Sequence, residues 1–407
     1  MIGPFNPLSA EFQEDRYEVL KKYREQEPVH GSPEKVLSGR ELTRWTLTRY
    51  DDAVFVLKDS RFVKELKNVF PDAPPPPIPS GMEALVSSQR NQMLFRDPPD
   101  HTRLRRLVTQ AFTPRIVEQL NPRIKEIAVD LLSDIKVGSE FDVVSAFAFP
   151  LPVIVIAEML GVPHEDRDKI KSWSQSFIKT IDYKPSMEAY FQGNQATIEF
   201  RDYFRDIIRE RAKQPKTDLI SGLIQARDEG GKLSEDELLD MCILLLVAGH
   251  ETTVNLIANT IYLLNKYPNQ QELLRNQPEL MPNAIEEVLR FEPPVQVMGR
   301  QVAEELTLRG KTLHRGDFVN IWISSANRDE NQFENPDVFN ITRKDNRHLA
   351  FGQGHHFCLG APLARKEGEI SIATFLECFP HMELGTDHLE WTLSPLMRSL
   401  KSLPVRV

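Results

Sequence analysis

The spacing of apolar residues along the chain predicts helices for most of its length and short strands near its beginning. Residues 17–24 and 50–58 carry apolar positions at helical spacing, and Pro28 lies beyond the end of the first of these helices. Between them, residues 44–48 alternate polar and apolar side chains, which is the period of a half-buried strand. These elements predict a small mixed α/β lobe over about residues 1–65.

Residues 66–95 break this pattern, because proline fixes φ and lacks a backbone N–H donor. The prolines of this segment are Pro71, Pro74, Pro75, Pro76, Pro77 and Pro79. We therefore expect an irregular surface loop over the whole of this segment.

Helical spacing then dominates residues 115–211. We expect breaks near Gly138, at residues 161–163 and at residues 183–185, where glycine or proline interrupts the pattern. The last break separates two amphipathic segments.

The longest predicted helix begins after Ser234, which forms a capping box with Glu237, and continues to Tyr267, where Pro268 stops it. At about 1.5 Å per residue this helix reaches roughly 50 Å. Residues 242–248 are apolar all round, so the centre of the helix is predicted to be buried.

Polar residues follow this apolar centre at Gly249, His250, Glu251, Thr252 and Thr253. Their burial is costly unless they form hydrogen bonds. Thr252 can divert its helix hydrogen bond and open a groove that holds water, and Gly249 lets a flat body approach. A simple kink with a satisfied core threonine explains the same residues. We interpret His250 as a residue that happens to lie on this face of the helix, and not as a ligand.

The last third of the chain adds strands and a final helix. Glu287 and Arg290 stand one turn apart on a short helix, where we expect an exposed ion pair of little energetic weight. Further predicted elements are strands at residues 295–302 and 318–322, an irregular polar stretch at 327–347 and a helix at 363–379. The predicted fold class is mainly α with a smaller β-rich part.

Composition narrows the class of protein. The 407 residues are 41% hydrophobic, which is ample for a core, and the net charge of −9 argues against general nucleic-acid binding. Three cysteines make no disulfide framework. The first residues lack the features of a signal peptide, and we find no run of about 18 apolar residues. We expect a soluble cytoplasmic protein with no membrane segment.

A glycine-rich stretch at residues 351–361 contains the cysteine Cys358. Glycine permits φ > 0 and close approach to the backbone, so amides of this loop can point at the sulfur and stabilise its thiolate. A thiolate presented in this way is either a nucleophile, which needs a base nearby, or a metal ligand.

The pattern F-G-x-G-x-H-x-C-x-G from Phe351 to Gly360 resembles the haem-ligand loop of the cytochrome P-450 family. The resemblance implies that Cys358 is the proximal thiolate ligand of haem iron. It also implies that Phe351 and Gly352 lie at the haem and that His356 binds a haem propionate.

Two further motifs resemble the same family. In the pattern D-P-P-x-H-T-x-x-R, His101 and Arg105 share a helix face, and the resemblance makes them propionate partners, together with Arg300. The pattern A-G-x-E-T-T, which starts at Ala248, resembles the oxygen-binding groove. The resemblance implies that Ala248 and Gly249 contact the haem, that Thr252 bonds dioxygen and that Glu251 passes protons through water.

The E-x-x-R pair resembles a brace behind the haem in the same family. The resemblance gives Glu287 and Arg290 a structural role, and Arg343 is a candidate third member of their network.

The resemblance implies a single cytochrome P-450 haem domain over residues 1–407, present as a monomer with haem b and using dioxygen as co-substrate. The implied activity is a monooxygenase reaction, either hydroxylation or epoxidation. The chain has no flavin or nicotinamide fingerprint, so electrons come from NAD(P)H through a separate reductase with a ferredoxin or flavodoxin. Candidate docking residues for that partner are Arg103, Arg106 and Lys366.

The expected substrate is a fairly large, mostly apolar molecule, such as a polyketide, macrolide, terpenoid, steroid or fatty acyl chain. In the resembled family the proline-rich loop and the broken helix pair cover the pocket. The candidate pocket residues carry no charge: Leu85, Val86, Leu244, Leu245, Ala248, Val295, Val297, Leu396 and Met397.

Three alternatives remain at this point. A peroxide-driven peroxygenase would not need the proton delivery of Glu251 and Thr252. In a non-catalytic haem or gas-binding protein the same two residues would be idle. A zinc site would use His355, His356 and Cys358, although structural zinc usually has four ligands and no fourth is evident.

Overall fold

The computed structural model describes residues 2–35, 41–75, 77–228 and 233–407. The chain divides into two compact units. The β unit comprises Met1–Pro76, Glu286–Cys358 and Trp391–Arg398, and the helical unit comprises Pro77–Ile285, Leu359–Glu390 and Ser399–Val407.

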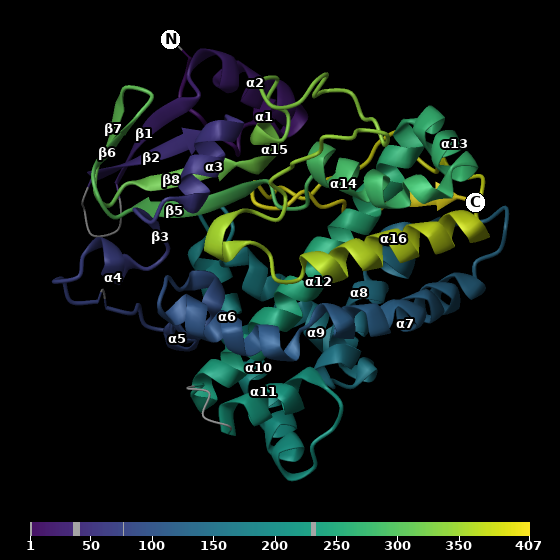
Figure 1. Cartoon of the computed structure of the whole chain (residues 1–407), viewed down its shortest axis with the longest axis horizontal. Coiled ribbons are helices and arrows are strands. Elements are labelled where there is room, and N and C mark those ends of the chain that lie inside the picture. Colours follow the sequence, from purple (N-terminus) through teal and green to yellow (C-terminus); the bar gives the residue numbers. More distant parts are fainter. Residues whose placement is uncertain (1, 36–40, 76, 229–232) are drawn as a thin grey trace. The chain divides into compact units, whose positions relative to one another are not determined.

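The β unit is built on a five-stranded sheet with the order β1-β2-β8-β5-β3 (Figure 1). β2 pairs in parallel with β8, whereas the pairs β1–β2, β8–β5 and β5–β3 are antiparallel. The strands are β1 (Val29–Lys35), β2 (Glu41–Leu47), β3 (Phe62–Val63), β5 (Val297–Val302) and β8 (Phe318–Trp322). The strands predicted near the start and in the last third of the chain therefore join one sheet.

Short helices accompany this sheet, and two apolar clusters form its core. Leu47, Val56 and Ile321 belong to one cluster, in which α3 packs against the strands. Phe5 and Phe12 meet Trp322 edge-on in the other. The remaining elements of the unit are α1 (Ala10–Glu14), α2 (Arg16–Gln26), α3 (Tyr50–Lys58), α4 (Leu66–Val69), α15 (Ile323–Ala326), η5 (Gly354–His356) and the hairpin β6 (Leu306–Leu308) and β7 (Lys311–Leu313). α14 (Met281–Phe291) leads into the unit from the preceding segment.

The helical unit contains most of the helices, which confirms the predicted fold class. Its helices are α5 (Glu83–Asn91), α6 (Asp100–Ala111), α7 (Pro114–Ser133), α8 (Pro150–Leu160), α9 (Arg167–Lys179), α10 (Met187–Lys213), α11 (Leu219–Asp228), α12 (Glu235–Lys266), α13 (Pro268–Asn276) and α16 (Ala361–Cys378). A small sheet joins β4 (Glu140–Asp142), β10 (Pro404–Arg406) and β9 (Glu383–Leu384).

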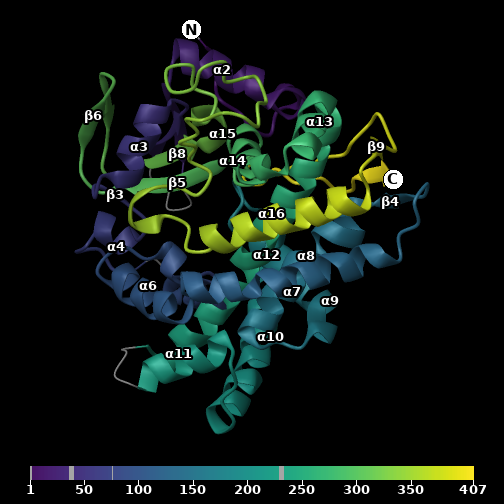
Figure 2. The ribbon, with the colours of Figure 1, turned by 45° about the vertical axis from the view of Figure 1, so that its right-hand side comes forward.

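α12 is the central helix of this unit. Its capping box is complete, because Ser234 Oγ accepts from Glu237 N–H at 3.1 Å and Glu237 Oε2 accepts from Ser234 N–H at 2.9 Å. α12 packs against α8 and α16, and α16 packs in turn on α7 (Figure 2). The predicted start and end of this helix are confirmed.

The expected breaks in the helical segment are also confirmed. Gly138 and Gly161 have φ of 87° and 81°, and Lys184 has φ of 51°. A left-handed residue ends a helix at low cost when it is glycine, as at the end of α8.

The prediction that residues 66–95 are irregular is wrong for much of that segment. α4, α5 and η1 (Met93–Phe95) lie within it, whereas residues 70–75 and 77–82 contain no helix. The prolines end at Pro79, so nothing prevents residues 83–91 from forming hydrogen-bonded turns. Pro76 lies outside the described residues.

The chain has no unbroken run of about 18 apolar residues, but one helix has the length and mean hydropathy of a membrane span. Within the described ranges, α12 is long and apolar enough by composition. However, 72% of its most apolar window is buried inside the protein, as in the core helix of a globular fold.

Candidate functional site

The cysteine loop of the β unit is closed by its own backbone. The N–H of Cys358 donates to the carbonyl oxygen of Phe351 at 2.9 Å, and Gly352 N–H donates to Leu349 at 2.8 Å. Cys358 is partly exposed. The loop therefore holds the cysteine in one backbone position.

Two glycines of this loop have backbone conformations that would strain a residue with a side chain. Gly352 and Gly354 have φ of 68° and 73°, which L-residues rarely adopt. A Cβ at Gly354 would lie 2.5 Å from the carbonyl oxygen of Leu57, because the loop packs closely on α3. The pattern F-G-x-G thus fixes the loop conformation against α3.

The other two cysteines occupy different environments. Cys242 is fully buried in α12, and burial raises the pKa of its thiol, which stays protonated. Cys378 ends α16, and partial burial together with the charge of Glu377 raises the pKa of its thiol. Of the three cysteines, Cys358 alone lies on a glycine-rich loop.

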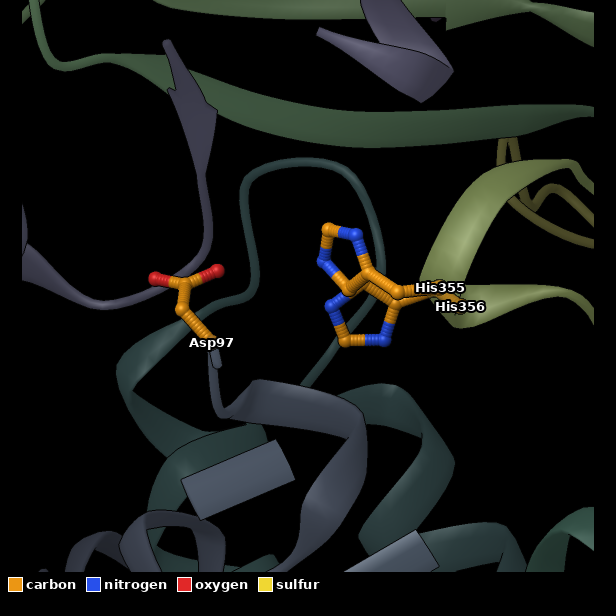
Figure 3. A group of neighbouring side chains, drawn as sticks. All are labelled: Asp97, His355 and His356. Carbon is orange, nitrogen blue, oxygen red and sulfur yellow. The ribbon is translucent and has the colours of Figure 1, made fainter. Parts of the chain in front are cut away.

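The two histidines of the loop lie on η5 with ring centroids 4.5 Å apart. Figure 3 shows the rings of His355 and His356 side by side; Asp97, also labelled there, belongs to the helical unit. Among the described residues, Cys358 belongs to no cluster of three side chains close enough to share one ion. This geometry gives no support to the zinc alternative.

Glu287 and Arg290 form a buried brace behind this loop. Both side chains are fully buried, so the expectation of an exposed pair is wrong. Arg290 donates to both carboxylate oxygens of Glu287 at 2.8 Å, and Arg343 also pairs with Glu287, at 3.1 Å. Complete pairing is what makes the burial of these charges tolerable.

The brace connects to the cysteine loop through Asn327. Arg290 Nη1 donates to the carbonyl oxygen of Asn327 at 3.0 Å, and the side chain of Asn327 accepts from the N–H of Leu349 at 2.7 Å. Leu349 in turn accepts from Gly352, as described above. The ion pair thus supports the loop two residues before Phe351.

In the helical unit, α12 exposes one stripe along its otherwise buried central part. The accessible positions follow helical spacing at Leu245, Ala248, Gly249 and Thr252, with Glu251 beside them. The hydroxyl of Thr252 donates to the carbonyl oxygen of Ala248 at 3.2 Å. The stripe coincides with the predicted oxygen-groove motif.

The structure gives Gly249 a packing role. A Cβ at this position would lie 2.8 Å from two side-chain carbons of Ile156 on α8. Glycine therefore lets α12 and α8 approach each other, and its predicted contact with a flat cofactor stays a prediction.

Two titratable side chains of the motif have shifted pKa values. Burial raises the pKa of Glu251, and the charge of Lys171 opposes this shift in part. His250 is fully buried, its Nδ1–H donates to Leu246 O at 2.7 Å, and burial lowers its pKa to about 4. His250 is therefore a neutral core residue.

Sequence reasoning missed Glu367. This side chain on α16 is fully buried, and desolvation raises the pKa of its carboxyl well above the ordinary value. The available signal was the spacing of Glu367, which stands four residues after Leu363 and so shares the apolar face of the predicted helix at residues 363–379.

The predicted cationic partners occur in both units. His101 and Arg105 stand one turn apart on α6, with His101 buried and Arg105 partly exposed. Arg300 is a buried residue of β5. His356 lies in the cysteine loop, two residues before Cys358.

The three docking candidates differ in their surroundings. Arg103 pairs with Glu237, with one N–O distance of 3.2 Å, and with Asp100, so it supports the start of α12. Lys366 pairs with Glu369 at 2.6 Å, and Arg106 is exposed. The structure therefore uses Arg103 internally, which weakens its case as a docking residue.

The predicted pocket residues also separate into groups. Leu85 and Leu244 are buried and Val86 is partly exposed, while Val295 and Met397 form an isolated backbone bridge. Val297 belongs to the apolar cluster of Trp322, and Leu396 packs against it. Core packing thus accounts for Val297 and Leu396 without a ligand.

The donor chemistry of these residues fits an iron protoporphyrin. Cys358 offers a sulfur ligand on a rigid loop, and the accessible stripe of α12 contains the small residues Ala248 and Gly249. His101, Arg105, Arg300 and His356 offer positively charged or hydrogen-bonding groups for carboxylates.

Comparisons with known proteins agree with this chemistry. The sequence model of the family Cytochrome P450 matches residues 43–397. The chain is 43% identical over 404 residues to the polyketide biosynthesis cytochrome P450 PksS of Bacillus subtilis, covering 98% of each chain. It is 39% identical over 409 residues to mycinamicin IV hydroxylase/epoxidase of Micromonospora griseorubida, covering 99% of this chain and 97% of that protein.

Solved structures show the same likeness. The structure of P450BioI in complex with an acyl carrier protein ligated with hexadec-9Z-enoic acid superposes with a TM-score of 0.88 at 38% identity. The match covers 98% of this chain and 99% of that one.

Proposed function

The chain belongs to the cytochrome P450 family of haem monooxygenases, and we propose that it inserts one oxygen atom from dioxygen into a large, mostly apolar substrate. The product is an alcohol or an epoxide. The observation that carries the proposal is the closed, glycine-dependent loop that presents Cys358.

Cys358 holds the haem iron through its sulfur in this proposal. A thiolate-bound haem supplies the redox chemistry that cleaves dioxygen. Arg300 and His356 bind propionates from the β unit, and His101 and Arg105 bind them from the helical unit. Phe351, Gly352, Ala248 and Gly249 contact the haem. We further propose that all 407 residues serve as one haem domain.

Glu251 and Thr252 handle protons. Because burial raises the pKa of Glu251, this carboxyl can be protonated closer to neutral pH than an exposed glutamic acid and can donate a proton through water. The Thr252 hydroxyl lies on the accessible stripe of α12 and can donate a hydrogen bond to the reacting oxygen.

Electrons come from a ferredoxin or flavodoxin, reduced by NAD(P)H through its own reductase, in the cytoplasm. The protein acts as a monomer. Arg106 and Lys366 are the remaining candidates for contact with an acidic redox protein, and association would then weaken as salt rises.

The substrate is an apolar chain of the polyketide or fatty acyl type. Leu245 and Ala248 offer an uncharged accessible surface along α12, and the buried Leu244 directly precedes them in the chain. The names of two similar proteins, one in polyketide biosynthesis and one bound to an acyl carrier protein with a hexadecenoic acid, support this class.

Turnover with a surrogate ferredoxin, its reductase, NADPH and isotopically labelled dioxygen tests the proposal. We expect one labelled oxygen atom in the product and slower turnover in Glu251→Gln. A protein that oxidises the same substrate only with hydrogen peroxide, at a rate that Glu251→Gln leaves unchanged, would be a peroxygenase. Haem reduction without any product from a broad substrate panel would favour a haem or gas-binding protein.

A further inference from the structure

Arg16 is a buried arginine with part of its hydrogen-bonding capacity unused. It lies at the start of α2 in the β unit, and its side chain is buried, with 2% of the residue exposed. Nη1 donates to the side-chain oxygen of Gln296 at 3.3 Å, whereas Nε and Nη2 have no hydrogen-bond partner. A guanidinium presents Nε–H and one Nη–H side by side, a geometry that matches the two oxygens of a carboxylate.

The surrounding charges do not neutralise Arg16. Glu292 is the carboxylate of this region, and it accepts from Tyr17 at 2.7 Å and from Arg398 at 3.0 Å. Arg328 lies over the ring of Tyr17 at 3.6 Å. Three guanidinium groups thus gather around one carboxylate in a buried region.

This arrangement disfavours the charge of Arg16 unless an anion is present. Burial, and next the positive charge of Arg398, lower the pKa of Arg16 to about 10, so the side chain is still protonated at neutral pH. A buried cation without a full set of partners is costly. An anion at Nε and Nη2 would pair the charge and satisfy both donors.

We propose that the Nε–Nη2 edge of Arg16 binds a small carboxylate inside the β unit. This site includes none of the residues assigned above to haem or substrate. It is nevertheless connected to two segments predicted to line the pocket, because the N–H of Gln296 donates to Leu396 O at 2.8 Å and Val295 bridges Met397. A bound carboxylate would therefore stabilise the packing of these segments.

Thermal unfolding of the haem-loaded protein tests the site, with formate replacing chloride at constant ionic strength. We expect a saturable rise of the wild-type Tm, on the order of 2 °C, because a ligand of the native state raises stability by mass action. Arg16→Met should abolish the rise.

Arg24→Met is the matched control, because Arg24 is a buried arginine of the same helix whose donors contact Glu330 at 3.0 Å and Ser325 Oγ at 2.9 Å. This variant should lose stability but keep the response to formate. A wild-type protein without a response, or an equal response in Arg16→Met, would overturn the proposal.

If Arg16→Met fails to fold, Arg16→Lys provides a second test of the same site. Lysine keeps the charge but lacks the paired donors, so half-saturation should require at least about tenfold more formate. An unchanged half-saturating concentration would contradict binding at the Nε–Nη2 edge.

Discussion

The N–H of Cys358 donates to the carbonyl oxygen of Phe351 at 2.9 Å, so the first residue of the glycine-rich pattern and its cysteine are held together. The residues between them make the turn that this closure requires. Because Gly354 faces Leu57 O, the loop also takes its place against α3. The backbone position of Cys358 in the β unit is therefore set by these contacts.

Gly354→Ala should destabilise the protein more than a left-handed conformation alone explains. The strain of φ near 73° costs roughly 1–2 kcal/mol, and the close contact of a Cβ with Leu57 O adds to it. Gly310→Ala is the control, because Gly310 has φ of 75° but no atom lies within 4 Å of the position that its Cβ would take. Urea unfolding of the haem-loaded proteins measures both losses, and equal losses would contradict the packing of the loop on α3.

Arg290→Met should lower the free energy of unfolding by about 3–5 kcal/mol, because it removes the main partner of the buried Glu287 carboxylate. Haem retention should fall as well, since the brace reaches the cysteine loop through Asn327. Lys401→Met, which breaks an exposed pair with Glu390, should cost far less, because water and salt screen an exposed ion pair. Similar losses in the free energy of unfolding for the two variants would show that the buried ion pair is no more important for stability than an exposed one.

Thr252→Ala should still consume NADPH but should release hydrogen peroxide in place of product. The reason is the loss of the hydroxyl on the accessible stripe of α12. Thr260→Ala is the matched control, because Thr260 donates to the helix carbonyl of Leu256 in the same way but is buried outside the motif. The ratio of product to NADPH consumed is the readout; a ratio that stays at the wild-type value in Thr252→Ala removes the proton-handling role of this residue.

Glu367→Gln should change how stability depends on pH. The folded protein raises the pKa of Glu367, so between the ordinary pKa and the raised one the folded state binds a proton that the unfolded state has lost. Wild-type stability therefore falls as pH rises through this window, by up to about 1.4 kcal/mol per pH unit from this group.

The Glu367→Gln variant lacks this contribution, so its stability relative to the wild type should increase with pH. Glu377→Gln, at a position on the same helix with an exposed side chain, should show no such trend. Parallel pH profiles for wild type and Glu367→Gln would refute the assignment.

Sequence reasoning found the elements whose signals are local. The capping box at Ser234, the left-handed break at Gly161 and the cysteine loop each depend on residues within a few positions of one another. The helix at residues 83–91 was not predicted, because the helix-breaking effect of the prolines was assumed to extend beyond Pro79.

Burial was harder to predict than secondary structure. Spacing alone places Glu287 and Arg290 on one helix face but does not reveal that Asn327 and Arg343 complete a covered network there. Arg103 illustrates the same limit, because its partner Glu237 lies on another helix, α12. Contacts between distant segments decide whether a polar residue lies on the surface, in a buried ion-pair network or in the apolar core.

The central claim is that Cys358 binds haem iron as a thiolate, and the carbon monoxide spectrum of the reduced protein tests it most directly. The wild type and Cys378→Ser should both show the red-shifted Soret band typical of thiolate ligation, because Cys378 lies at the exposed end of α16. Cys358→Ser should lose that band. A Cys358→Ser protein that retains the red-shifted band would contradict the account.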